Sequence, residues 1–134
     1  MPLPMGLESI AGAEQLHEWF GYWPDFHDAE VLKFHLHAGE LSSVTVLTWE
    51  MTNKVNTKGH YELTKHIVVE FVLRGIVNAN VVDLWDHSIL LDIGVEKTEA
   101  GFRLNFCAAY GLSGTVEVQG LSLRITPGKP FSSA

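Results

Sequence analysis

Cysteine and long apolar runs are the first things that this sequence lacks. Cys107 is the one cysteine in 134 residues, so an internal disulfide is excluded and a reducing compartment is favoured. No apolar run approaches about 18 residues, the length that a membrane-spanning helix requires. The amino-terminal stretch has neither the basic region nor the apolar region of a secretory signal, MPLPMGLESIAGAEQL. We therefore predict a cytoplasmic protein that makes no membrane contact.

Basic residues are also few. The chain has 9 Lys and Arg against 16 Asp and Glu, which gives a net charge of −7. An acidic surface repels phosphate backbones, so direct nucleic-acid binding is disfavoured. The same charge attracts a basic protein and speeds its encounter with this chain.

Sequence motifs for phosphate binding and nucleophilic catalysis are missing. The chain contains no GxGxxG, GxxxxGK[ST], HExxH or CxxC. Ser113 lies between Gly111 and Gly114, but these glycines do not stand two residues to each side, as a G-x-S-x-G nucleophile elbow requires. Cys107 follows Phe106 in an apolar run and is predicted to be a small buried residue. None of these residues forms a complete catalytic set.

The length and hydrophobic content predict one folded domain over residues 1–134. Residues 8–20 carry the helical pattern, with Ser9 as the predicted N-cap and Gly21 as the stop. Leu16 and Phe20 lie on its apolar face, which Ile10, Ala13 and Trp19 extend.

The rest of the chain alternates as strands do. Seven segments are predicted, over residues 32–37, 45–51, 61–73, 76–85, 89–95, 102–106 and 116–125. We read 52–60 as a mobile hairpin loop and 128–134 as a frayed tail. The expected fold is therefore α+β, with one short N-terminal helix packed on a curled, mostly antiparallel sheet of about seven strands.

The alternation also predicts a core and one bulge. The expected core residues are Leu32, Phe34, Leu47, Trp49, Ile67, Val69, Phe71, Ile93, Leu104 and Phe106. In the last strand the apolar positions change from even (Val116, Val118) to odd (Leu121, Leu123), which predicts a β-bulge at Gly120.

The stretch WPDFHDAEV concentrates polar chemistry just before the first strand. Continued regularly backward, that strand would point Asp28 and Glu30 to its apolar side, where unpaired carboxylates are costly. One interpretation is that Asp28 accepts backbone N–H bonds of the turn that Trp23 and Pro24 open, with His27 packed beside it. The other is that the motif Phe26, His27, Asp28 and Glu30 supplies a functional carboxylate or ligand.

A metal site is the sharpest form of the functional interpretation. His27, Asp28 and Glu30 would join His35 and His37, which share one face of the next strand. Zinc needs three or four convergent ligands. These residues are not at an established ligand spacing, so the sequence predicts neither a bound metal nor another cofactor.

Aromatic residues gather around the end of the predicted helix: Trp19, Phe20, Tyr22, Trp23 and Phe26. Such a cluster packs a helix end onto a sheet. Any part of it that is exposed would suit a binding hot spot, because Trp and Tyr dominate such sites.

Three segments carry a resemblance to a known family. They are WFGYWPDFHDAEV with the following KFHLH, then EFVLRGIVNANVVDLWDHSILLDIGVEK, and finally FRLNFCAAYGLSGTVEVQGLSLRITPG. Together they resemble the Imm50 group of bacterial immunity proteins, which accompany polymorphic toxins in contact-dependent competition. The likeness spans nearly the whole chain, and FHDAE is its most specific part.

This resemblance implies a non-catalytic protein that binds and neutralises a cognate toxin. It supplies no catalytic residues to carry over and leaves the partner-binding residues open. The acidic charge favours a basic toxin such as a nuclease, and the 52–60 segment is a suitable place for contact. Two alternatives stay open: a small metal-dependent hydrolase using His27, Asp28 and Glu30, and a homo-oligomeric module with a small-molecule ligand. A homodimer is compatible with the sequence.

Overall fold

A computed structural model describes most of the chain. The described residues are 6–37, 39, 41–55, 57–59, 61–83 and 88–128, and for 51–55, 61–63 and 110 the description covers the backbone alone. In this part of the chain the elements are η1 (Leu7–Ser9), α1 (Ala13–Phe20), β1 (Glu30–His35), β2 (Ser42–Val55), β3 (Tyr61–Val82), β4 (Ile89–Lys97), β5 (Phe102–Tyr110) and β6 (Ser113–Pro127). None of the helices described has the length and apolar composition needed to cross a membrane.

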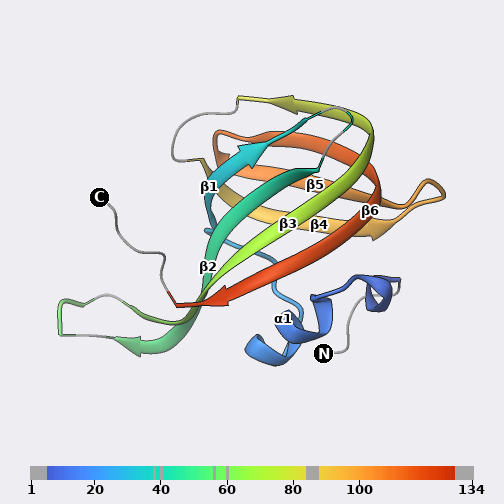
Figure 1. Ribbon diagram of the computed structural model, residues 1–134. Helices are drawn as coiled ribbons and strands as arrows, with labels where there is room; N and C mark the ends of the chain where they lie inside the picture. The colour runs from blue at the N-terminus through green and yellow to red at the C-terminus, as the bar shows by residue number, and fades with distance from the viewer. Residues whose placement is uncertain are drawn as a thin grey trace.

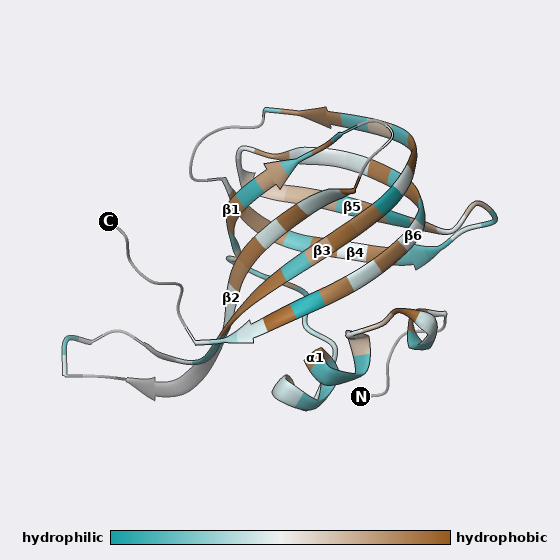
Figure 2. Ribbon diagram, in the orientation of Figure 1, coloured by the Kyte–Doolittle hydropathy of each residue, from teal (hydrophilic) through white to brown (hydrophobic). Residues whose placement is uncertain are grey.

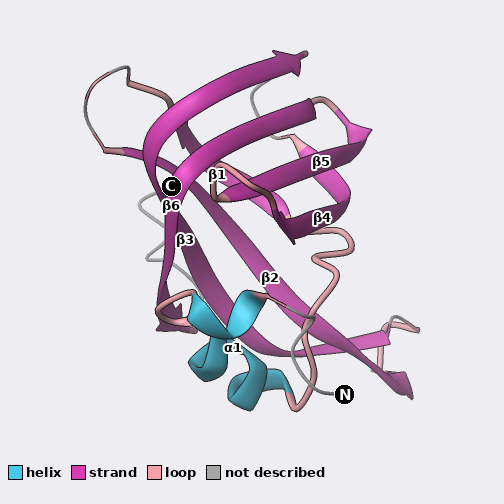
Figure 3. Cartoon of the chain, turned by 90° about the vertical axis from the view of Figure 1, so that its right-hand side faces the viewer, coloured by secondary structure: helices cyan, strands magenta, loops and turns pink. Residues whose placement is uncertain are grey.

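The strands form a closed antiparallel barrel in the order β1-β2-β3-β6-β5-β4 (Figure 1). Hairpins join β1 to β2, β2 to β3, β4 to β5 and β5 to β6, whereas β3–β6 and β4–β1 are neighbours that lie far apart in sequence. Apolar and polar residues alternate along the strands (Figure 2). The short helices lie at one end of the barrel (Figure 3). The predicted α+β class with a curled antiparallel sheet is confirmed.

The described strands number six, not seven, because β3 is one strand of 22 residues. The segments predicted at 61–73 and 76–85 are continuous in it up to Val82. Gly75 joins them with φ +65°, a left-handed conformation that bends a strand without ending it. The pairing with β6 runs across this bend, from Leu73↔Leu121 to Ile76↔Val118.

The inward face of β6 changes as predicted, but the bulge lies elsewhere. Val118 and Leu121 are both buried, so the inward positions do pass from even to odd. Pairing with β3 nevertheless stays in register across Gly120, and the register shift falls between Ile76 and Asn78 of β3. The predicted bulge at Gly120 is therefore wrong, since the two strands change face together at the bend.

The core fills the interior of the barrel. Six of the ten predicted core residues are buried there: Ile67, Val69, Phe71, Ile93, Leu104 and Phe106. Phe34 is partly buried and meets Phe106 edge to face, with ring centroids 6.0 Å apart. Leu32 is 40% exposed, and Leu47 and Trp49 are half-buried, so the prediction is wrong for these three.

Strand β2 turns the other face inward. Val44, Val46 and Thr48 are buried, while Leu47 and Trp49 alternate with them on the outside. Both faces of this strand carry large or β-branched residues, so the period of two does not decide which face is inside.

In β1 the cause of the error is an irregularity. The pairing with β2 shifts between Val31 and Lys33, at Leu32. An extra residue in one strand reverses the facing of all that follow. Val31 and Phe34 therefore pack against the core, although they are three residues apart, and Leu32 faces solvent.

The predicted helix 8–20 is divided in two. Ser9 belongs to η1 and its hydroxyl bonds the carbonyl of Gly6, so it is not the N-cap of a long helix. Between the helices, Ala11 forms a bridge to β6, where its carbonyl accepts the N–H of Leu123 at 2.7 Å. Gly21 ends α1 as predicted, with φ +84°.

The 52–60 segment is shorter as a loop than predicted. Strand β2 continues to Val55, which pairs with Tyr61, so residues 52–55 belong to a hairpin that extends away from the barrel (Figure 1). Residues 57–59 form the turn, and 56 and 60 lie outside the described residues. Of the predicted tail, Gly128 is described and donates its N–H to the carbonyl of His66 at 2.7 Å, while 129–134 lie outside the description.

Candidate interaction surface

The FHDAE motif lies where the barrel closes between β1 and β4. Asp28 donates its N–H to the carbonyl of Leu90 at 2.8 Å, and Leu90 donates back to Ala29 at 2.9 Å. Val31 then donates to Ser88 at 2.9 Å. The backbone of the motif thereby forms the seam that lengthens the short β1–β4 pairing, in which Glu30 is opposite Ile89.

The contacts of the side chains explain why these residue types occur in the turn. Phe26 is 1% exposed and meets Phe71 edge to face at 5.5 Å. Asp25, not Asp28, accepts the turn's backbone N–H, from His27 at 2.9 Å. His27 Nδ1 lies 3.2 Å from the carbonyl oxygen of Leu91. We expected the Asp28 carboxylate to accept a backbone N–H of the turn. Asp25 accepts it instead, from the residue two positions later, as in an Asx turn.

The structure brings two of the proposed metal ligands together. His27 Nε2 lies 3.6 Å from Asp28 Oδ2, and both side chains are about half exposed. His35 and His37 stack on each other, with ring centroids 5.9 Å apart. Within the described residues, no group of three or more His, Cys, Asp and Glu is placed to hold a metal ion. The geometry therefore gives the metal interpretation no further support.

The two nucleophile candidates have ordinary surroundings. Cys107 is exposed on β5, so the expectation of a buried thiol is wrong. Asp92 pairs with it across the outer face of the barrel. Ser113 begins β6, and its hydroxyl accepts the N–H of Ala108 at 3.3 Å.

The aromatic cluster is divided by the fold. Phe20 and Phe26 are buried, whereas Trp19, Tyr22 and Trp23 are half-buried at the edge of the core. Phe20 and Tyr22 are in contact, with ring centroids 5.7 Å apart. The partly exposed members of the cluster are therefore the amphipathic aromatics, Trp and Tyr.

These aromatics lie at the foot of the β2–β3 hairpin. There the register shifts between Thr48 and Glu50, so Lys65 and His66 of β3 oppose Trp49 of β2. The ring centroids of Trp49 and His66 are 5.8 Å apart. Lys65 has φ +54°, and its carbonyl accepts the indole N–H of Trp19 at 2.9 Å. The irregular pairing thus fixes the end of α1 against the hairpin.

Two further polar contacts hold this junction. The Lys65 ammonium donates to the carbonyl of Phe20 at 3.4 Å, at the negative end of α1. The Tyr22 hydroxyl donates to Glu50 Oε2 at 2.8 Å. Burial, followed by the hydrogen bond and the negative charge of Glu50, raises the pKa of Tyr22 to about 12. Tyr22 therefore stays a neutral donor throughout the physiological pH range.

We call this junction the hairpin base. Its residues are Trp19, Tyr22, Trp49, Glu50, Lys65 and His66. All are half-buried except Lys65, which is exposed. The hairpin base combines aromatic faces with a carboxylate, an ammonium and an imidazole at the root of a projecting ribbon, a composition typical of a protein-binding surface.

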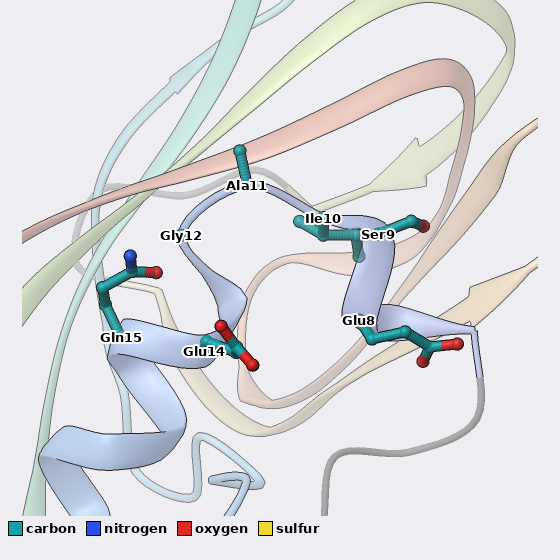
Figure 4. A pocket seen from close by; sticks show the side chains of 7 residues that line it. All are labelled: Glu8, Ser9, Ile10, Ala11, Gly12, Glu14 and Gln15. Carbon is teal, nitrogen blue, oxygen red and sulfur yellow. The ribbon is translucent and has the colours of Figure 1, made fainter.

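A shallow hollow of about 280 Å³ lies between η1 and the first turn of α1 (Figure 4). It is lined by Glu8, Ser9, Ile10, Ala11, Gly12, Glu14 and Gln15. Glu8 also accepts the N–H of Gly6 at 3.0 Å. Two of its lining residues are glutamates, and most of the lining is exposed.

Sequence reasoning found part of the hairpin base. It singled out Trp19 and Tyr22, and it placed a contact in the neighbouring 52–60 segment. It missed Trp49, which was assigned to the core, and Lys65. The local pattern gave no signal for Trp49, because both faces of β2 carry apolar residues and only the structure shows that Val44 and Val46 face inward.

Searches of family models, curated proteins and solved structures found no match to this chain.

Proposed function

We propose that this chain is a non-catalytic immunity protein that binds a cognate toxin domain, with the hairpin base and the β2–β3 hairpin as the contact surface. The observation that carries the proposal is the group of half-exposed aromatics at the foot of a projecting hairpin. Trp19 and Tyr22 are each held by a hydrogen bond, so they present a preorganised surface. The sequence resemblance to immunity proteins supports the same conclusion.

Charge points to the class of toxin. The chain as a whole carries a net charge of −7, which complements a basic partner. A nuclease toxin is basic where it holds nucleic acid. We therefore propose a nuclease or another basic toxin domain as the ligand.

Co-expression tests the function. The test requires a toxin domain encoded beside this gene, which is expressed with and without the chain while survival is measured. We expect the chain to protect the cells. Cells that die equally fast with soluble chain present would contradict the immunity function. Stoichiometric zinc, manganese or iron in the untagged protein would instead favour the metal-dependent hydrolase.

Trp49→Ala tests the surface separately. Loss of an interface tryptophan costs about 2 kcal/mol or more, so toxin binding should weaken at least about 30-fold. Leu32→Ala is the matched control, because it removes an exposed apolar side chain from β1, outside the hairpin base. If Trp49→Ala binds the toxin as the parent does, the contact surface lies elsewhere while the function stands.

A further inference from the structure

The second half of β3 has a free edge. From Arg74 to Val82 the strand pairs with β6 on one side. Strand β2 covers the other side only as far as Leu73, which pairs with Ser42. Within the described residues, the far side of 74–82 has no strand partner. This segment reaches the end of the barrel that lies away from α1 (Figure 1).

This edge is open to a further strand. In an antiparallel sheet, alternate residues of an edge strand direct their N–H and C=O groups away from the sheet. Proteins usually protect such edges with charged residues, proline or β-bulges, and this edge has one irregularity, between Ile76 and Asn78. Between Arg74 and Asp83 the sequence is the uncharged GIVNANVV. Val77 and Val82 are 50% and 55% exposed, so the edge offers apolar side chains as well as backbone groups.

The charges at the two ends of the edge identify its partner. Arg74 stands at the beginning and Asp83 just beyond the end. When two copies of this segment pair antiparallel about a two-fold axis, the Arg74 end of each meets the Asp83 end of the other. A parallel arrangement would instead bring like charges together. Two-fold symmetry is also the commonest arrangement of homo-oligomers.

We propose that the free edge of β3 binds the same edge of a second copy of this chain, which forms an antiparallel homodimer with one sheet continuing through both barrels. The small residues Gly75, Asn78 and Ala79 leave room for the backbones to approach. A single pair of strands buries less than the roughly 800 Å² per partner of a standard interface. The dimer should therefore be weak and depend on concentration.

Sedimentation of the full chain tests the proposal. Over about 10 µM to about 1 mM, the average mass should rise from the 14.9 kDa of one chain toward twice that value. Val77→Lys places an ammonium at the middle of the edge in both copies and should weaken dimerisation at least about tenfold. Leu32→Lys, on β1, is the matched control and should leave it unchanged.

A charge exchange then tests the orientation. Arg74→Glu and Asp83→Arg should each weaken the dimer, and the double variant should restore it, which damage to folding alone would not do. Either a mass that stays at 14.9 kDa throughout or a dimer insensitive to Val77→Lys would overturn the proposal. So would a monomeric chain whose Val77→Lys variant loses toxin binding, because the edge would then take a strand of the toxin.

Discussion

Four residues other than glycine hold a left-handed backbone in the described part of the chain: Phe26, Asp28, Lys65 and Asp83. This conformation costs an ordinary residue about 1–2 kcal/mol. Phe26 offsets the cost by burying its ring against Phe71. Lys65 does so with two hydrogen bonds to α1. Phe26, Asp28 and Lys65 thus lie at junctions between elements, where neighbouring contacts fix the backbone.

At Asp28 the backbone conformation, not the carboxylate, should decide stability. The residue has φ +64°, and its side chain is 41% exposed beside His27. Asparagine tolerates this conformation, so Asp28→Asn should change the free energy of unfolding by less than about 0.5 kcal/mol. Asp28→Val should lower it by about 1–2 kcal/mol, because a β-branched residue is strained there. Urea denaturation measures both, and equal losses in the two variants would contradict this account.

Tyr22 should give the chain a recognisable response to alkaline pH. Its pKa is raised to about 12 in the fold from 10.0, so the folded state keeps the phenol proton that the unfolded state loses. The stabilisation is present below pH 10 and is lost as pH rises toward 12. Tyr22→Phe should lower stability by about 1 kcal/mol at neutral pH through loss of the bond to Glu50.

The difference between parent and Tyr22→Phe isolates this residue from the other tyrosines and the lysines. Measured by urea denaturation at several pH values, the difference should shrink as pH rises above 10. A difference that grows in that range would mean that the phenolate, and not the phenol, is stabilised in the fold.

At the scale of elements, the contact between the N-terminal segment and β6 depends on one glycine. Gly12 has φ +91°, and a Cβ there would lie 2.2 Å from the carbonyl oxygen of Leu123. Gly12→Ala should therefore lower stability by about 2–4 kcal/mol, through backbone strain and displacement of the segment.

Gly21→Ala is the matched control for this substitution. Its φ is similarly positive, +84°, but no atom lies within 4 Å of the added Cβ. It should cost about 1 kcal/mol, the strain alone. Thermal melts of the two variants that agree with each other would show that the Gly12 contact with β6 contributes nothing.

The elements show where sequence patterns succeed and where they stop. Ile67, Val69 and Phe71 were predictable because the opposite face of β3 is mostly polar. The facing of β2 was not, because both of its faces carry apolar residues. In β1 the irregularity at Leu32 turns that residue outward while Phe34 stays inward, and bulges leave no reliable mark in the local composition. For the same reason Trp49 was predicted to lie in the core and was not predicted as part of the candidate site.

At the scale of the whole molecule, the sequence predicts the sheet but not its closure. The alternation of period two divides the side chains of each strand between two faces. Hairpin turns specify that strands adjacent in the sequence pair with each other. The pairing of β3 with β6, and the seam between residues 25–31 and 88–93, join segments far apart in the chain. The FHDAE motif could be recognised as unusual before the structure was known, but its place in the seam depends on this long-range closure.

The order of the strands also governs how the protein is made. Strand β3 pairs along most of its length with β6, which follows every other strand in the chain. While the ribosome synthesises the residues between them, the edge of β3 that pairs with β6 stays unpaired. The inward-facing residues Val69, Phe71 and Leu73 are not yet covered by a closed barrel. Such intermediates bind chaperones or associate with one another. Slow translation between residues 83 and 113 would lengthen this exposure, so the yield of folded protein should depend on the codons of that segment.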